Sequence, residues 1–104
     1  MDEKYNQLIK VSNPTIVYNN LQKYFGRPTD LYISNRKNKK YYIINSYNNK
    51  VVHFGSLMHK DYTFTRDKTK QKSYLARSGS IPGKWRDDKY SPNNISRSVL
   101  WDIL

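Results

Sequence analysis

The apolar residues of this chain recur first with the period of a helix and then with that of strands. Asn13 can cap a helix, and Pro14 is favoured at a first helical position. Gly26 then supplies a C-terminal stop. Between them, the apolar residues at helical spacing are Ile16, Val17, Leu21, Tyr24 and Phe25. The pattern predicts a helix over Pro14–Phe25, preceded by residues 1–12 as either a flexible arm or a short helical turn.

Three short runs rich in aromatic and β-branched residues follow, at Leu31–Ile33, Tyr41–Ile44 and Val51–Phe54. Gly55 is expected to end the last run. The turns that separate the runs are Asn35–Asn38 and Tyr47–Lys50, both rich in asparagine, which tolerates positive φ. Residues 31–55 are therefore predicted to form a three-stranded antiparallel β-meander.

The pattern of residues 61–104 predicts helices. Asp61 or Asp67 can cap the next helix, and Asp67 fits the spacing of the apolar residues better. Ser78–Gly83 ends that helix, an irregular loop follows, and Ser91 with its proline starts a last helix with an apolar stripe. The chain is predicted to be a single α+β domain over residues 1–104. It comprises an N-terminal helix, the meander, and two C-terminal helices joined by an irregular loop.

Positive charge is concentrated in the middle of the chain. Residues 36–97 contain fifteen of the nineteen Lys and Arg but four of the eight acids, so this segment carries +11, equal to the whole formal charge. A compact domain with this excess repels itself, which favours contact with an anionic partner. AT-rich codons are the alternative explanation, because they also encode the abundant Asn, Tyr and Ile. That bias would raise Glu as well, yet Glu3 is the one glutamate beside thirteen lysines.

Composition excludes several classes of protein. The chain has no cysteine, so it has no disulfide framework and no cysteine-based zinc site, which fits an intracellular or virion-interior protein. No apolar run approaches the roughly 18 residues of a membrane span, and the first residues lack the pattern of a signal peptide. Ten tyrosines predict a folded body that uses amphipathic rings in its core.

The sequence offers little for catalysis. A Tyr-rich strand, a turn and a strand ending in Phe-Gly are similar to the opening hairpin of GIY-YIG nucleases, and Arg66 or Arg77 could supply the arginine of that family. No glutamate follows Glu3, however, and the glycine expected near Tyr41 is absent. Without that carboxylate, metal binding and water activation are unsupported. We expect no enzyme activity and no catalytic residue.

No metal or cofactor is expected either. His53 and His59 lie on a strand and in the loop beyond it, without the spacing of a ligand pair. His53 is expected to bond to backbone and His59 to be exposed. Asp87 and Asp88 are flanked by cations and are expected to form local ion pairs or to cap a turn. The four glycines are scattered and form no phosphate-binding loop.

A nucleic-acid ligand requires cations placed near successive phosphates. The candidate residues are Arg36, Lys37, Lys39 and Lys40 at the tip of the meander, Lys68, Lys70, Lys72 and Arg77 on the following helix, and Lys84, Arg86 and Lys89 in the loop beyond. Candidates for stacking on bases are Tyr42, Tyr47 and Trp85. Strand alternation predicts that one of Tyr41 and Tyr42 points inward. No base-reading motif is present, so binding is expected to be largely independent of base sequence.

From Tyr41 onward, the order of short motifs is itself characteristic. They are His53-Phe54-Gly55, Lys60–Thr63, Tyr74–Arg77, Gly83–Trp85, Asp88–Asn94 and Leu100-Trp101. In this order they resemble a family of small basic proteins of unknown function from giant and other large nucleocytoplasmic DNA viruses, including the mimivirus relatives. The resemblance covers roughly residues 41–101. It implies a viral origin and a location in the virion or in the viral factory of the host cytoplasm, and it carries no catalytic residue.

Two functions remain. The first is non-enzymatic binding of nucleic acid, with DNA slightly favoured over RNA because the look-alikes are DNA viruses. The second is a minor structural or virion protein that docks on acidic protein partners. The apolar end of the C-terminal helix, residues 99–104, is either buried against the sheet or offered for self-association or to a partner groove. No membrane partner is expected.

Overall fold

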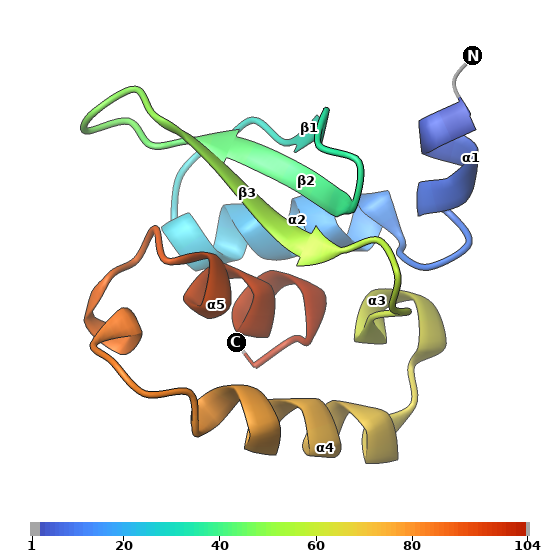
Figure 1. Cartoon of the computed structure of the whole chain (residues 1–104). Coiled ribbons are helices and arrows are strands. Elements are labelled where there is room, and N and C mark those ends of the chain that lie inside the picture. Colours follow the sequence, from blue (N-terminus) through green and yellow to red (C-terminus); the bar gives the residue numbers. More distant parts are fainter. Residues whose placement is uncertain (1–2, 104) are drawn as a thin grey trace.

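The computed structural model describes residues 3–103 and has the α+β architecture that the sequence predicts (Figure 1). Its helices are α1 (Glu3–Leu8), α2 (Pro14–Phe25), α3 (Tyr62–Thr65), α4 (Lys68–Gly79) and α5 (Pro92–Ile95). A short 3₁₀ turn, η1 (Trp85–Asp87), precedes α5, and a π-helical segment, η2 (Ser96–Leu100), continues it. The strands are β1 (Tyr32–Ile33), β2 (Lys39–Ile44) and β3 (Val51–Ser56).

Helix α2 has the bounds that its local signals predict. The Asn13 side chain accepts hydrogen bonds from the backbone of Thr15 at 3.1 Å and of Ile16 at 3.3 Å. Gly26 ends the helix in the left-handed conformation, with φ of 68°, and its N–H donates to the Gln22 carbonyl. The apolar face of α2 then packs into the core.

The three strands form the predicted meander, in the order β1-β2-β3 with antiparallel pairing. Tyr41 is opposite Phe54, and both side chains are buried, whereas Tyr42 lies on the other face of the sheet. The prediction that one of the two tyrosines points inward is confirmed. Asn49 has φ of 60° in the turn, as its residue type favours. The expectation that Gly55 ends β3 is wrong, because the strand continues to Ser56.

The core lies between the inner face of the sheet and the helices α2, α5 and η2 (Figure 1). Its fully buried residues include Leu8, Val17, Leu21, Tyr41, Ile43, Phe54, Ile95, Val99 and Leu100. The apolar end of the C-terminal helix is thus buried through Trp101, while Ile103 is 45% exposed and Leu104 lies outside the described residues. Pro92 begins α5 as predicted, although Ser91 makes no side-chain capping bond.

The structure contains two short helices that the sequence did not clearly predict. Helix α3 was not predicted, and α1 was one of two alternatives for residues 1–12. Of the two aspartates, Asp67 caps α4 as predicted, and Asp61 caps the additional four-residue helix α3. Within residues 1–12, α1 forms and buries Leu8 completely, so this segment adopts the helical alternative and not a free arm; residues 1 and 2 lie outside the described part. None of the helices between residues 3 and 103 is both long and apolar enough to cross a membrane.

Helix α4 lies on the far side of the C-terminal helices from the sheet (Figure 1). Two hydrogen bonds join α4 to the C-terminal segment. Arg97 Nη1 donates to the Leu75 carbonyl at 2.7 Å, and Gln71 Nε2 donates to the Trp101 carbonyl at 2.8 Å. The ring of Tyr74 stacks on that of Trp101, with centroids 4.2 Å apart. Ser78 is the one residue of α4 that is buried. Polar contacts, the Tyr74–Trp101 pair and the partly buried Leu75 therefore dock the helix.

Candidate functional site

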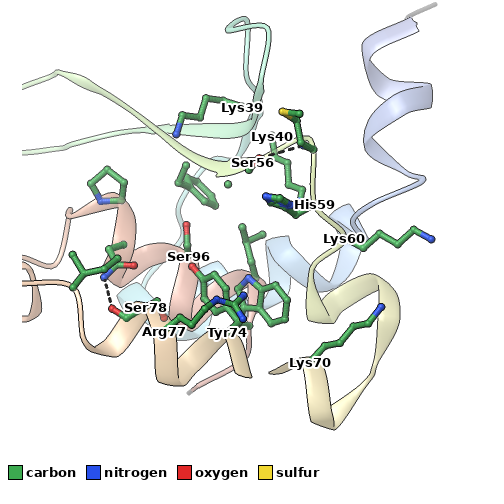
Figure 2. Close-up of a pocket in the computed structure, with 18 of the residues that line it drawn as sticks. Lys39, Lys40, Ser56, His59, Lys60, Lys70, Tyr74, Arg77, Ser78 and Ser96 are labelled. Carbon is green, nitrogen blue, oxygen red and sulfur yellow. Dashed lines mark hydrogen bonds between the residues drawn. The ribbon is translucent and has the colours of Figure 1, made fainter. Parts of the chain in front are cut away.

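A groove of about 990 Å³ lies between the end of β3, helix α4 and the C-terminal helices (Figure 2). Four exposed cations line it, namely Lys39, Lys60, Lys70 and Arg77. Its apolar lining includes Phe54, Tyr74, Leu100 and Trp101. We call this feature the basic groove. It is lined by cations from β2, the loop after β3, and α4.

One face of α4 forms a wall of the basic groove. Lys70, Tyr74 and Arg77 line it together with Ser73 and Ser78. These positions recur at three- and four-residue steps, which places them on one side of a helix. The Arg77 guanidinium donates from Nη1 to Ser73 Oγ at 2.8 Å, which holds the charged group beside the groove.

The opposite wall comes from the sheet and from the loop after β3. Lys39 is the first residue of β2, and Met58, His59 and Lys60 follow the last residue of β3. Figure 2 shows Lys39 and Lys60 on this wall and Lys70 and Arg77 on the α4 wall. Both walls thus contribute cationic residues, although the ammonium group of Lys60 points away from α4 and lies 5.6 Å from the centroid of the Phe64 ring, outside the groove lining.

No acidic residue lines the basic groove within residues 3–103. Like charges that converge on a concave, partly apolar surface raise the local positive potential and attract anions. The groove is therefore expected to attract anions.

Lys40 also borders the groove, but it is not an exposed cation, which corrects the sequence prediction. Its side chain is 2% exposed, and Nζ forms an ion pair with Oδ2 of the fully buried Asp61 at 3.0 Å. Desolvation lowers the pKa of Lys40, and the Asp61 carboxylate opposes this shift. The buried pair leaves Lys40 with its own counterion, so we remove it from the set of phosphate-binding residues.

Glycine at position 55 makes room for this pair. A Cβ atom on Gly55 would lie 3.2 Å from both Cβ and Cδ of Lys40 and 2.8 Å from Cδ1 of Leu100. Gly55 also has φ of 83°, a conformation that L side chains rarely adopt. The Lys40 side chain can thus pass close to β3 on its way to Asp61.

The other predicted cations lie outside the basic groove. Arg36 and Lys37 are exposed in the turn between β1 and β2, and Lys84 is exposed in the loop after α4. Lys68 and Lys72 are on α4 but off its groove-facing stripe. Three of the outlying cations contact rings: Lys68 lies over Tyr62, Arg86 over Trp85 and Lys89 over Tyr24.

None of the three predicted stacking residues lines the groove. Tyr42 stacks on Tyr32, with centroids 4.9 Å apart, on the outer face of the sheet. Tyr47 is 87% exposed in the turn between β2 and β3. The guanidinium groups of Arg86 and Arg97 lie 4.3 Å and 5.4 Å from the centroid of the Trp85 ring. Nε1 of Trp85 donates a hydrogen bond to a backbone carbonyl. Trp85 is therefore engaged in packing the loop after α4.

The two histidines lie in different surroundings. Nδ1 of His53 is 2.8 Å from Ser34 Oγ, so its partner is a side chain and not the backbone as expected. Desolvation lowers the pKa of His53, and the charges of Arg36 and Lys39 lower it further. His59 is exposed, as predicted, and lines the basic groove. Among residues 3–103 no group of three side chains is placed to hold a metal ion.

Sequence reasoning missed Lys60, His59 and Tyr74 as groove residues. A signal for part of the site was available, because Lys70 and Arg77 are seven residues apart and therefore share a helix face. Lys60 had no such signal. It joins the site because the loop after β3 turns back toward α4.

By fold and site, this chain is a small α+β protein with a three-stranded antiparallel sheet and a basic groove. Residues 29–78 match a family of unknown function, DUF5754. The match runs from just before β1 almost to the end of α4, and it shares residues 41–78 with the segment whose motif order was noted in the sequence. No curated protein and no solved structure matches the chain.

Proposed function

We propose that this protein binds nucleic acid through the basic groove, largely independently of base sequence and without catalysing a reaction. The observation that supports this function most is the convergence of four exposed cations on one groove without acidic lining residues in the described part of the chain. Phosphate contacts of this kind supply affinity without carrying sequence information. Among residues 3–103, no carboxylate lines the groove to serve as a base or to hold a metal, which favours binding over catalysis.

The biological setting is proposed from the resemblance over residues 41–101. It favours a large DNA virus, a location in the virion or the viral factory, and DNA over RNA as the ligand. Association with the packaged genome would suit a protein with a net charge of +11.

The proposal is tested by fluorescence anisotropy with labelled 25-mer duplex and single-stranded DNA at several salt concentrations. Four phosphate contacts predict a log–log salt slope of about −3.6 on duplex DNA. A variant with Lys39, Lys60, Lys70 and Arg77 all changed to Gln is expected to lose about tenfold or more in affinity at 0.1 M salt, and to flatten the slope.

The matched control changes four exposed lysines outside the groove to Gln, namely Lys10, Lys23, Lys50 and Lys72. It has the same net charge as the groove variant, so the comparison separates position from total charge. Equal losses in both variants would overturn the groove as the binding site, and absence of binding at low salt would overturn the function.

The alternative function, docking on an acidic protein, is supported by the same positive potential. It is distinguished in the same assay with labelled polyglutamate. Binding of polyglutamate that depends on the groove cations, together with no binding of DNA or RNA, would replace the nucleic-acid proposal.

A further inference from the structure

We infer that the basic groove takes a single strand of nucleic acid in preference to a duplex, with bases against its apolar surface and phosphates beside its cations. This inference rests on the proposed function and specifies the ligand of the same site. It follows from three properties of the groove: its apolar lip, its concave shape and the distribution of its cations.

The apolar lip consists of Met58 and Ile81, which line the groove from the loop after β3 and the loop after α4. They are 75% and 48% exposed, respectively, although both are large apolar side chains. Contact with another apolar surface would remove them from water, which is favourable. Unpaired bases offer such surfaces on their faces, whereas a duplex keeps those faces stacked inside the helix.

Below the lip, the partly exposed ring of Tyr74 continues the lining, whereas Phe54 and Leu100 lie behind it and are fully buried. A ligand that engages only through phosphates would leave the lip and this ring in water. A strand whose bases turn inward would cover both. The combination of cations with an apolar and aromatic lining is the one that single-strand-binding grooves use.

The shape of the groove, like its lining, favours a single strand over a duplex. A duplex is a stiff rod, with a persistence length of about 50 nm, and presents a convex surface of phosphates. A concave space of about 990 Å³ within a domain of 37 × 35 × 23 Å cannot follow that surface over any length. A single strand can bend to enter it. The space is also larger than isolated phosphate groups require.

The cations are distributed so that a strand can be neutralised from both sides. Lys39 and Lys60 are on the sheet wall, and Lys70 and Arg77 are on the α4 wall (Figure 2). Successive phosphates of a strand between the walls would therefore have Lys39 within reach on one side and Lys70 and Arg77 on the other. Lys70 and Arg77 are about 10 Å apart along the helix axis, from a rise of about 1.5 Å per residue.

The test compares a 25-nucleotide single strand with the duplex of the same sequence, by anisotropy under identical salt. We expect the single strand to bind about tenfold more tightly. A lip variant, Met58→Gln with Ile81→Gln, is expected to lose most of that preference while duplex binding stays unchanged. The control variant, Ile44→Gln with Val51→Gln, changes two exposed apolar residues outside the groove and should keep it.

A second readout locates the strand. The chain has two tryptophans, and Trp101 lines the groove whereas Trp85 does not. In a Trp85→Phe variant, a saturating single strand is expected to change the Trp101 emission, and a saturating duplex is expected to leave it nearly constant.

The possible failures are distinguishable. If neither form of DNA binds at low salt, the proposed function fails. If duplex binds as tightly as the single strand and with the same dependence on the four groove cations, the proposed function stands and this inference is overturned. The inference is also overturned if the lip variant keeps its preference for the single strand.

Discussion

Replacement of Asp61 by alanine is expected to lower the free energy of unfolding by about 3–5 kcal/mol. The reason is the buried ion pair: Asp61 is completely buried, and its removal leaves the Lys40 ammonium, itself 2% exposed, without a counterion. Asp61 also accepts hydrogen bonds through Oδ1 from the backbone N–H and the side-chain hydroxyl of Thr63. Urea denaturation followed by circular dichroism measures the loss.

The matched control is Asp67→Ala. Asp67 is also an N-cap aspartate, and it accepts hydrogen bonds from the backbone of Thr69 and Lys70, but it has no buried cationic partner. Its loss is expected to cost about 1 kcal/mol, the usual value for a helix cap. If the two substitutions destabilise the protein equally, the buried pair contributes nothing beyond a cap.

A double variant separates the loss of the Lys40–Asp61 attraction from the cost of leaving the Lys40 charge buried without a partner. Lys40→Met with Asp61→Asn removes both charges and keeps a capping side chain at position 61. Because a buried pair can often be replaced by uncharged groups at little cost, this variant is expected to be more stable than Asp61→Ala. A double variant that is less stable than Asp61→Ala would contradict the assignment of the loss to a buried charge.

Gly55→Ala is expected to be the second large loss, about 2–5 kcal/mol. The positive φ of 83° costs an L residue about 1–2 kcal/mol. The new Cβ would also lie 2.8 Å from Leu100 Cδ1, and overpacking of a core typically costs about 1–3 kcal/mol more. The midpoint and slope of a urea transition give this quantity.

Gly26→Ala is the control for the backbone contribution. Gly26 has φ of 68°, yet a Cβ there would meet nothing within 4 Å. The Gly26→Ala variant should therefore lose only the free energy that a positive φ costs an L residue. Equal losses at the two glycines would mean that Leu100 and Lys40 can move aside freely, which would contradict tight packing between β3 and the C-terminal helix.

The sequence predicted the parts of the fold that depend on neighbouring residues. Helix α2 was placed to the residue because Asn13, Pro14 and Gly26 each act within one turn of the chain. The meander followed for a similar reason, since short polar turns join its strands. The prediction for Gly55 was wrong because glycine was taken as the end of a strand. In the structure the strand continues, since Lys40 of the partner strand and Leu100 leave no room for a side chain at position 55.

The candidate site depended on contacts that no local pattern contains. Lys40 is ion-paired with a residue 21 positions away, and a lysine in a basic run gives no sign of burial. The face of α4 that carries Lys70 and Arg77 could be read from spacing. That this face would lie opposite Lys60 depended on how the loop after β3 and the C-terminal helices pack, which sequence periodicity does not specify.

The polar docking of α4 has a consequence for how the molecule moves. Hydrogen bonds from Arg97 and Gln71 hold this helix, together with the partly buried side chains of Tyr74 and Leu75. We therefore expect α4 to open at a lower free energy than the core between α2 and the sheet. Elements with few buried apolar contacts open locally at a lower free energy than the whole domain. The α4 wall of the groove is thus expected to be its more mobile side. A ligand that contacts both walls would favour the closed arrangement, and part of its binding free energy would be spent on that ordering.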